Sequence, residues 1–142
     1  MKKASWILLT VLGVVITLLS VVSAVHAYWT DDDYGIGGRK VSKVAGGDPV
    51  IETALRGIRG TSAAYGVSYG VLFLAIVLGP YRRGDVWAWK TLLAVGLIHL
   101  GIVALRIPFL GTQLGLSAAA NQVVILVVGL LLDVGRLKGA RG

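Results

Sequence analysis

The sequence predicts an all-α membrane protein, a four-helix transmembrane bundle with a long external loop between helices 1 and 2 and a short interfacial helix. The 142 residues are 56% hydrophobic and only 15% charged, whereas average soluble domains are about 45–50% apolar and about 25% charged. The chain also contains four long apolar stretches. In a bilayer each can satisfy its backbone hydrogen bonds internally only as a helix. We therefore expect one integral membrane domain over residues 1–142.

Charged and turn-forming residues bound the four stretches. A hydrocarbon core of about 30 Å needs about 20 predominantly apolar residues per helix. The predicted membrane helices cover residues 4–28, 61–79, 87–105 and 114–135. Lys90 and His99 interrupt the third, and Asn121, Gln122 and Asp133 interrupt the fourth.

The first stretch also has features of a secretory signal. Met1-Lys2-Lys3 is a positive start, and Val25-His26-Ala27 fits a small-x-small cleavage site. The apolar core of a signal peptide spans only about 7–15 residues, however, and this stretch is longer. We expect a retained helix, with a cleaved signal and three remaining helices as the alternative.

The external loop, residues 29–60, is the only sizeable segment outside the predicted membrane helices. Its glycines favour turns, and its Asp31-Asp32-Asp33 run is a solvated segment or, less favoured, a cation site with oxygen ligands. Asp48-Pro49 has the form of an N-cap followed by the first helical position. Ile51, Leu55 and Ile58 then recur at helical spacing, which predicts a short amphipathic helix at the membrane interface.

Basic residues predict the orientation. There are 14 Lys and Arg against 7 Asp and Glu, a net charge of +7. Most basic residues flank apolar stretches, where they set topology and meet lipid head groups, so we expect no nucleic-acid partner. An even number of helices puts three short basic flanks on one side, and the positive-inside rule makes that side, with both termini, cytoplasmic. These residues are Lys2, Lys3, Arg82, Arg83, Arg136, Lys138 and Arg141.

Aromatic and small residues suggest how the helices sit and pack. Rings at helix ends favour the head-group region, and small residues four apart let two helix backbones approach closely. Ser62, Gly66 and Gly70 form such a stripe, as do Gly111 and Gly115, which favours packing within one chain over a dimer face. The expected aromatic belt is Trp6, Tyr28, Trp29, Tyr81, Trp87 and Trp89.

Five polar residues are predicted at a similar depth in the outer half of the bilayer, as a candidate ligand-binding layer. They are Tyr65, Tyr69, His99, Asn121 and Gln122. An ionisable residue inside a membrane is by default a functional hypothesis, and histidine titrates near neutral pH. A histidine bonded to a neighbouring glutamine is equally an ordinary tie between helices.

Lys90 and Asp133 are predicted about one turn inside helices 3 and 4, near the cytoplasmic face. Consecutive helices joined by a short connection are antiparallel neighbours, so the two charges would lie at the same depth. A structural ion pair is one interpretation and a proton or ion relay another. Lys90 could also extend to the head groups, and Asp133 could pair with Arg136.

The residue inventory disfavours catalysis, and we expect neither a cofactor nor a metal. The chain has no cysteine and two histidines, which excludes thiolate ligands and nucleophiles. His26 and His99 are predicted at different depths, which disfavours a haem with two histidine ligands. The sequence contains no phosphate-binding loop, nucleophile elbow or metalloprotease motif.

Three segments of the sequence carry a resemblance to known membrane proteins. They are Arg59-Gly60-Thr61-Ser62-Ala63-Ala64-Tyr65-Gly66, Gly79-Pro80-Tyr81-Arg82-Arg83-Gly84-Asp85 and Trp87-Ala88-Trp89-Lys90. Together with the layout from Pro49 to Asp133, they resemble small prokaryotic four-helix membrane proteins, and the plan is similar to DoxX-like proteins. We separately expect an integral protein of a prokaryotic cytoplasmic membrane. Some DoxX-like proteins are accessory subunits of membrane redox complexes, and no active-site motif transfers to residues here.

Three functional hypotheses follow. The first is a non-enzymatic accessory or assembly subunit that contacts a membrane-protein partner or a second copy, because small-residue faces are present and a catalytic set is not. The second is a small oligomeric transporter or channel-like protein that uses His99 and Gln122, with the Lys90–Asp133 pair as a further candidate. The third is a membrane-embedded protein that binds a lipid or a quinone at Tyr65, Tyr69 and His99.

Overall fold

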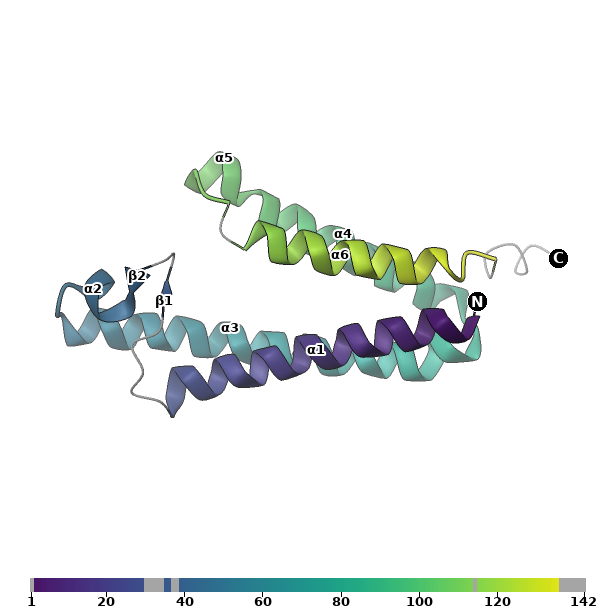
Figure 1. Cartoon of the computed structure of the whole chain (residues 1–142), viewed down its shortest axis with the longest axis horizontal. Coiled ribbons are helices and arrows are strands. Elements are labelled where there is room, and N and C mark those ends of the chain that lie inside the picture. Colours follow the sequence, from purple (N-terminus) through teal and green to yellow (C-terminus); the bar gives the residue numbers. More distant parts are fainter. Residues whose placement is uncertain (1, 30–34, 37–38, 114, 136–142) are drawn as a thin grey trace. The chain divides into compact units, whose positions relative to one another are not determined.

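The computed structural model describes residues 2–29, 35–36, 39–113 and 115–135, and this part of the chain is mostly helical (Figure 1). The all-α prediction is confirmed at that level. In chain order the elements are α1 (Lys2–Tyr28), β1 (Gly35–Ile36), β2 (Arg39–Lys40), α2 (Val41–Ala45), α3 (Pro49–Ile76), the π-helix η1 (Val77–Tyr81), α4 (Val86–Ala104), α5 (Arg106–Leu110) and α6 (Leu116–Leu131).

Three helices of the described chain are long and apolar enough to cross a membrane, namely Ala4–Tyr28, Pro49–Tyr81 and Val86–Leu110. The apolar helix α6 has 16 residues, or about 24 Å at 1.5 Å per residue, which is less than the hydrocarbon thickness of about 30 Å. It is shorter than the predicted 114–135 because Gly115 precedes it with a left-handed φ of 79°, and the chain leaves the helix in turns at 132–135.

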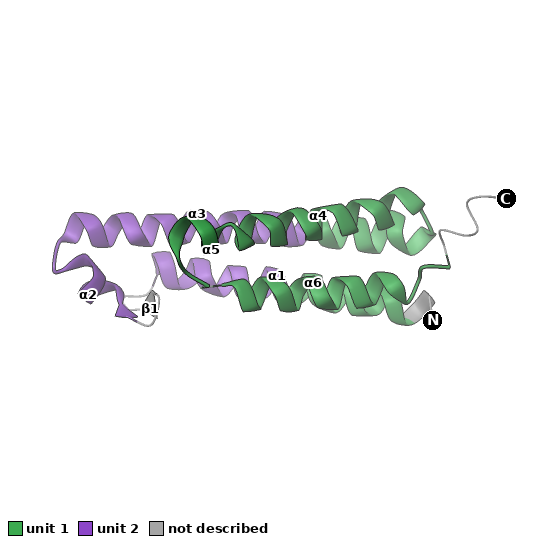
Figure 2. Cartoon of the chain, turned by 90° about the horizontal axis from the view of Figure 1, so that it is seen from above, with its two compact units in different colours: residues 1–14, 72–142 green, residues 15–71 purple. Residues whose placement is uncertain are grey.

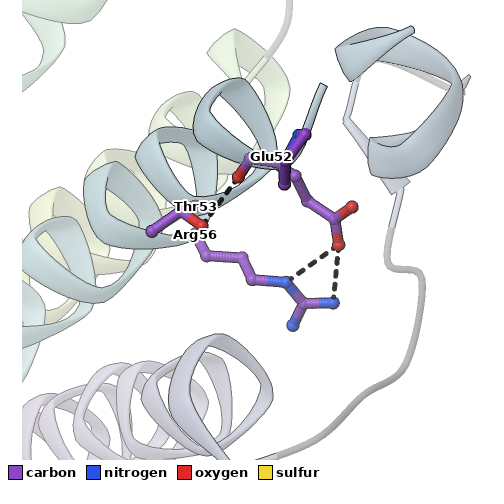
Figure 3. Close-up of polar contacts among 4 residues, drawn as sticks. Glu52, Thr53 and Arg56 are labelled. Carbon is purple, nitrogen blue, oxygen red and sulfur yellow. Dashed lines mark hydrogen bonds and ion pairs between the residues drawn. The ribbon is translucent and has the colours of Figure 1, made fainter. Parts of the chain in front are cut away.

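The start of α3 differs from the prediction. The N-cap is confirmed, because Asp48 Oδ1 accepts the backbone N–H of Val50 at 2.8 Å. The predicted interfacial helix is not a separate element, however, but the first turns of one helix that continues to Ile76. Glu52 and Arg56 stabilise these turns through an i,i+4 ion pair of 3.2 Å (Figure 3). The helix continues without interruption through Gly57 and Gly60, and the next proline is Pro80.

The segment before α3 contains a hairpin and a short helix that the sequence analysis did not predict. Strands β1 and β2 pair antiparallel, with Gly35 opposite Lys40 and Ile36 opposite Arg39. Helix α2 buries Val41 and Ala45 and ends at Gly46, whose φ of 63° needs a residue without a Cβ. The Asp31-Asp32-Asp33 run lies outside the described residues.

Helix α3 does not stop at the predicted residue 79. It passes through Pro80 as the π-helix η1 and reaches the turn at Gly84. Proline inside a helix lacks an N–H and collides with the carbonyl four residues earlier. A wider π-turn accommodates that defect without ending the helix.

Helix α4 matches the predicted span 87–105 closely, and α5 follows after Leu105. The predicted small-residue motif at Gly111 and Gly115 is wrong as a helix-packing motif. Both glycines have positive φ, 61° and 79°, and they flank the loop between α5 and α6. At both positions glycine allows a left-handed backbone conformation that other residues rarely adopt.

The chain divides into two compact units, residues 1–14 with 72–142 as unit 1 and residues 15–71 as unit 2 (Figure 2). In unit 2, α1 and α3 pack antiparallel with glycines at their seam. Gly66 meets Ser20, Gly70 meets Thr17, and the Tyr28 ring lies on Gly60. The predicted stripe is confirmed for Gly66 and Gly70, whereas Ser62 is exposed and bonds back to its own helix.

Unit 1 has its core between the start of α1, the end of η1, α4 and α6. Helix α4 buries Ala88, Leu92 and Gly96 in successive turns, and Gly96 lies against Leu126 of α6. The buried side chains from the surrounding helices are Leu9, Phe73, Val77, Tyr81, Val123, Leu126 and Leu130.

We expect Gly70→Ala to destabilise the protein. A Cβ at Gly70 would lie 3.2 Å from the Cα of Thr17, a backbone atom that cannot rotate away. Overpacking costs about 1–3 kcal/mol, which exceeds the gain of about 1 kcal/mol from replacing a helical glycine with alanine. The measurement is the free energy of unfolding in detergent micelles.

Gly57→Ala is the matched control, since nothing lies within 4 Å of a Cβ at that position of the same helix. It should leave stability unchanged or raise it. Equal stability changes in both variants would contradict the close approach of α1 and α3.

Candidate functional site

The last backbone carbonyls of α6 accept hydrogen bonds, in part from side chains on other helices of unit 1. The last four carbonyls of a helix lack partners within it, and in α6 these belong to residues 128–131. The carbonyls of Val128 and Leu131 accept the N–H groups of Leu132 at 3.1 Å and Val134 at 3.2 Å. Those of Gly129 and Leu130 accept from side chains on other helices.

Ser5 of α1 binds the carbonyl of Gly129. Its Oγ lies 2.6 Å from that oxygen and 2.5 Å from the hydroxyl of Tyr81. A serine hydroxyl has one hydrogen, so Ser5 donates to Gly129 and Tyr81 donates to Ser5. Both side chains are fully buried. Gly129 permits the approach, because a Cβ there would lie 2.7 Å from Leu9 Cδ2.

Trp89 of α4 binds the next carbonyl. Its Nε1 donates to the oxygen of Leu130 at 3.0 Å, which also accepts the N–H of Asp133 at 3.1 Å. Three helical segments thus meet at the end of α6. We call Ser5, Tyr81, Trp89, Gly129 and Leu130 the terminal cluster.

Two further contacts belong to the same end of unit 1. The Arg82 guanidinium lies 4.7 Å from the centroid of the Trp6 ring, a cation–π contact. Asp133 follows α6 and is 3% exposed. The first turns of α1, the turn after η1 and the end of α6 therefore lie together at one end of unit 1.

The terminal cluster has the chemistry of a structural tie. A nucleophilic serine needs a base that accepts its hydroxyl hydrogen, whereas Ser5 gives that hydrogen to a backbone carbonyl. Among the residues that the structure describes, no group of three or more His, Asp or Glu comes together as a metal site.

The predicted polar layer divides between the two units. In unit 1, His99 on α4 and Asn121 on α6 are exposed, and Gln122 is half-buried. The contact of Gly96 with Leu126 sets the antiparallel register. His99 comes three residues after Gly96 on α4, and Gln122 comes four residues before Leu126 on α6. The two residues therefore lie at the same level along this antiparallel pair of helices.

Tyr65 and Tyr69 lie on α3 in unit 2. Tyr65 is 75% exposed and Tyr69 is half-buried. The two tyrosines share a face of α3 at i,i+4, as the sequence predicts. Their joining with the residues of unit 1 into one layer stays a prediction.

Lys90 and Asp133 have different surroundings. Lys90 is exposed on α4, and Asp133 is buried after the end of α6. The structure does not record an ion pair between these two described residues, and Arg136, the alternative partner of Asp133, lies outside the described residues. The exposed position of Lys90 fits a side chain that extends to the head groups.

Sequence reasoning missed Ser5 and misplaced Tyr81. The belt prediction is wrong for Tyr81, which is fully buried, whereas Tyr28, Trp29 and Trp87 are exposed at 58%, 76% and 55%. Tyr81 is the last residue of the π-helix η1, so the helix continues past the predicted end at residue 79 and the Tyr81 ring is buried against Ser5. The sequence offered no signal for this contact, because Tyr81 lies two residues beyond the predicted helix 61–79 and Ser5 is the second residue of the predicted helix 4–28.

Searches of protein-family models, curated proteins and solved structures find no match to this chain.

We expect Tyr81→Phe to lower the free energy of unfolding by about 1–2 kcal/mol, because Ser5 Oγ loses a buried hydrogen-bond donor. The measurement is denaturant unfolding in micelles. Tyr65→Phe removes the same hydroxyl from a side chain that is 75% exposed and should be neutral. A Tyr81→Phe variant as stable as the parent chain would contradict the role of this hydroxyl.

Proposed function

We propose that the chain is a polytopic protein of the cytoplasmic membrane that crosses the bilayer four times. Three helices have the required length and composition. The shorter α6 forms the fourth membrane crossing if the bilayer thins slightly around it, which costs only fractions of a kcal/mol per Å of mismatch. Its terminal carbonyls, bonded by Ser5 and Trp89, suit an end that lies at the edge of the hydrocarbon.

We further propose that the end of unit 1 with the terminal cluster faces the cytoplasm. Arg82 and Arg83 lie at this end, next to the start of α1, whose first turn contains Lys2 and Lys3. Basic residues in short flanks favour the cytoplasmic side. The segments before α1 and after α6 are then cytoplasmic, and the segment between α1 and α3 is external.

The function that we propose is that of an accessory or assembly subunit, whose open helices bind a transmembrane helix of a partner protein. The observation that carries this proposal is the exposure of the polar side chain of Asn121 on the otherwise apolar helix α6. Polar groups inside a bilayer normally face protein or water rather than lipid. A partner helix would supply that protein surface.

The surroundings of His99 support the same proposal. From Leu97 to Leu110 every residue of α4 and α5 is at least partly exposed, including Ile102 at 63% and Phe109 at 78%. A Cβ at Gly101 would meet nothing within 4 Å, so another helix backbone could approach closely there. The chain covers little of α4 and α5 by itself, since only 11% of an 18-residue apolar stretch within Val86–Leu110 is buried.

The sequence hypotheses of transport and of lipid or quinone binding remain alternatives that the same experiment separates. The chain is extracted from its native membrane in mild detergent, and what stays bound is identified by mass spectrometry. Other membrane subunits in fixed stoichiometry support the accessory role. A chain that comes out alone, or with only a small ligand, contradicts it and turns attention to flux in vesicles or to the ligand.

We expect Asn121→Leu to reduce retention of the partner subunit about threefold or more. The side chain provides both a donor and acceptors, and interhelical hydrogen bonds contribute about 0.6–2 kcal/mol in membranes. The readout is the partner-to-chain ratio after extraction. Ser68→Leu, a polar-to-leucine change at an exposed position of α3, should leave the ratio unchanged, and equal losses in both variants would count against binding of the partner at Asn121.

The orientation can be tested separately, because the chain has no cysteine of its own. We expect Lys43→Cys in α2 to react with a membrane-impermeant thiol reagent in intact cells. Arg83→Cys, in the turn after η1, should react only after permeabilisation. Both residues are exposed, so access depends on the side of the membrane, and the reverse labelling pattern would contradict the proposed orientation.

A further inference from the structure

The turn between η1 and α4 concentrates positive charge at one end of unit 1. Arg82 and Arg83 precede Gly84, and Lys90 follows on the second turn of α4. Within residues 82–90 these three cations stand against one carboxylate, that of Asp85. Arg82, Arg83 and Lys90, which we call the basic turn, therefore carry excess positive charge.

Of the three cations, Lys90 has the position that most favours an anionic ligand. It lies within an apolar helix that is long enough to cross a membrane, and its side chain is exposed rather than turned into the core. A charge on a lipid-facing surface is costly unless it reaches the head groups or a partner. Lysine stems extend along apolar surface and place the ammonium at the interface, and side chains on a helix tilt toward its N-terminus, which in α4 follows the turn with Arg82 and Arg83.

The two arginines are held at the same end. Arg82 lies over the Trp6 ring at 4.7 Å. The Nη2 atom of Arg83 lies 3.9 Å from Asp85 Oδ2, yet 71% of its side chain is exposed. Trp87, at 55% exposure, is an aromatic side chain of the kind that sits at head-group level.

We propose that the basic turn binds the head group of an anionic phospholipid. Guanidinium groups donate paired hydrogen bonds to phosphate oxygens, and an ammonium adds a point charge. The excess positive charge favours a lipid with net negative charge over a zwitterionic one. The ligand is a lipid rather than free phosphate, because Lys90 emerges from an apolar, lipid-facing helix surface where acyl chains can pack.

This proposal rests on membrane insertion, a part of the proposed function, but it requires no partner subunit. The purified full-length chain is reconstituted in vesicles with equal amounts of phosphatidylglycerol and phosphatidylcholine. Flotation of the chain with the vesicles checks insertion. The lipids that remain bound after extraction in mild detergent are then measured by mass spectrometry.

In the parent chain, retained phosphatidylglycerol should exceed retained phosphatidylcholine. Lys90→Gln should lower this ratio about fivefold, the change expected from about 1 kcal/mol for one basic residue near an anionic surface. Lys90→Arg should preserve the ratio. Lys43→Gln removes the same charge from an exposed position on α2 and should preserve it too.

Equal retention of the two lipids by the parent chain would overturn the proposal, as would an unchanged ratio in Lys90→Gln. Displacement of phosphatidylglycerol by excess inorganic phosphate would identify a phosphate site and overturn the assignment to lipid. A chain that floats without lipid preference refutes this inference alone. A chain that does not float refutes membrane insertion as well.

Discussion

The structure of unit 1 depends on how the carbonyls at the end of α6 are satisfied. In an apolar environment an unsatisfied backbone group costs several kcal/mol, and α6 is too short to carry its last carbonyls well into water. Ser5 from α1 and Trp89 from α4 bind two of them. Because these donors come from two other helices, the same requirement that closes α6 also fixes which helix ends lie together.

Close backbone approach is the second constraint, and glycine provides it in both units. Gly129 lets Leu9 and Ser5 reach α6, and Gly66 and Gly70 let α1 lie directly on α3. Opposite the glycines of α3 stand the small hydroxyl residues Ser20 and Thr17. Without a hydrophobic driving force between helices in lipid, such close packing supplies van der Waals contact that larger residues would prevent.

Two parts of unit 1, the end with the terminal cluster and the part of α4 after Gly96, differ in how far their polar groups are covered by the chain itself. Around the terminal cluster, polar groups are bonded within the chain, and the basic turn adds positive charge beside the expected head groups. Further along α4 burial ends at Gly96, and His99 and Asn121 lie on exposed faces. The end with the terminal cluster is closed by hydrogen bonds within the chain, whereas the other end of α4 is open and partly polar, and the proposed lipid and partner contacts use these two ends separately.

The sequence by itself determined the helical class, the start of α3 at Asp48-Pro49 and the small-residue seam at Gly66 and Gly70. Composition, capping and residue spacing are local properties, so they can be read along the chain. Only the tertiary structure decided that Tyr81 turns inward to Ser5, that Gly111 and Gly115 serve loop conformations, and that His99 lies on an exposed face. Each of these depends on helix rotation and on where a helix ends. Those are set by contacts between residues far apart in the chain, such as Ser5 with Gly129, which no local pattern specifies.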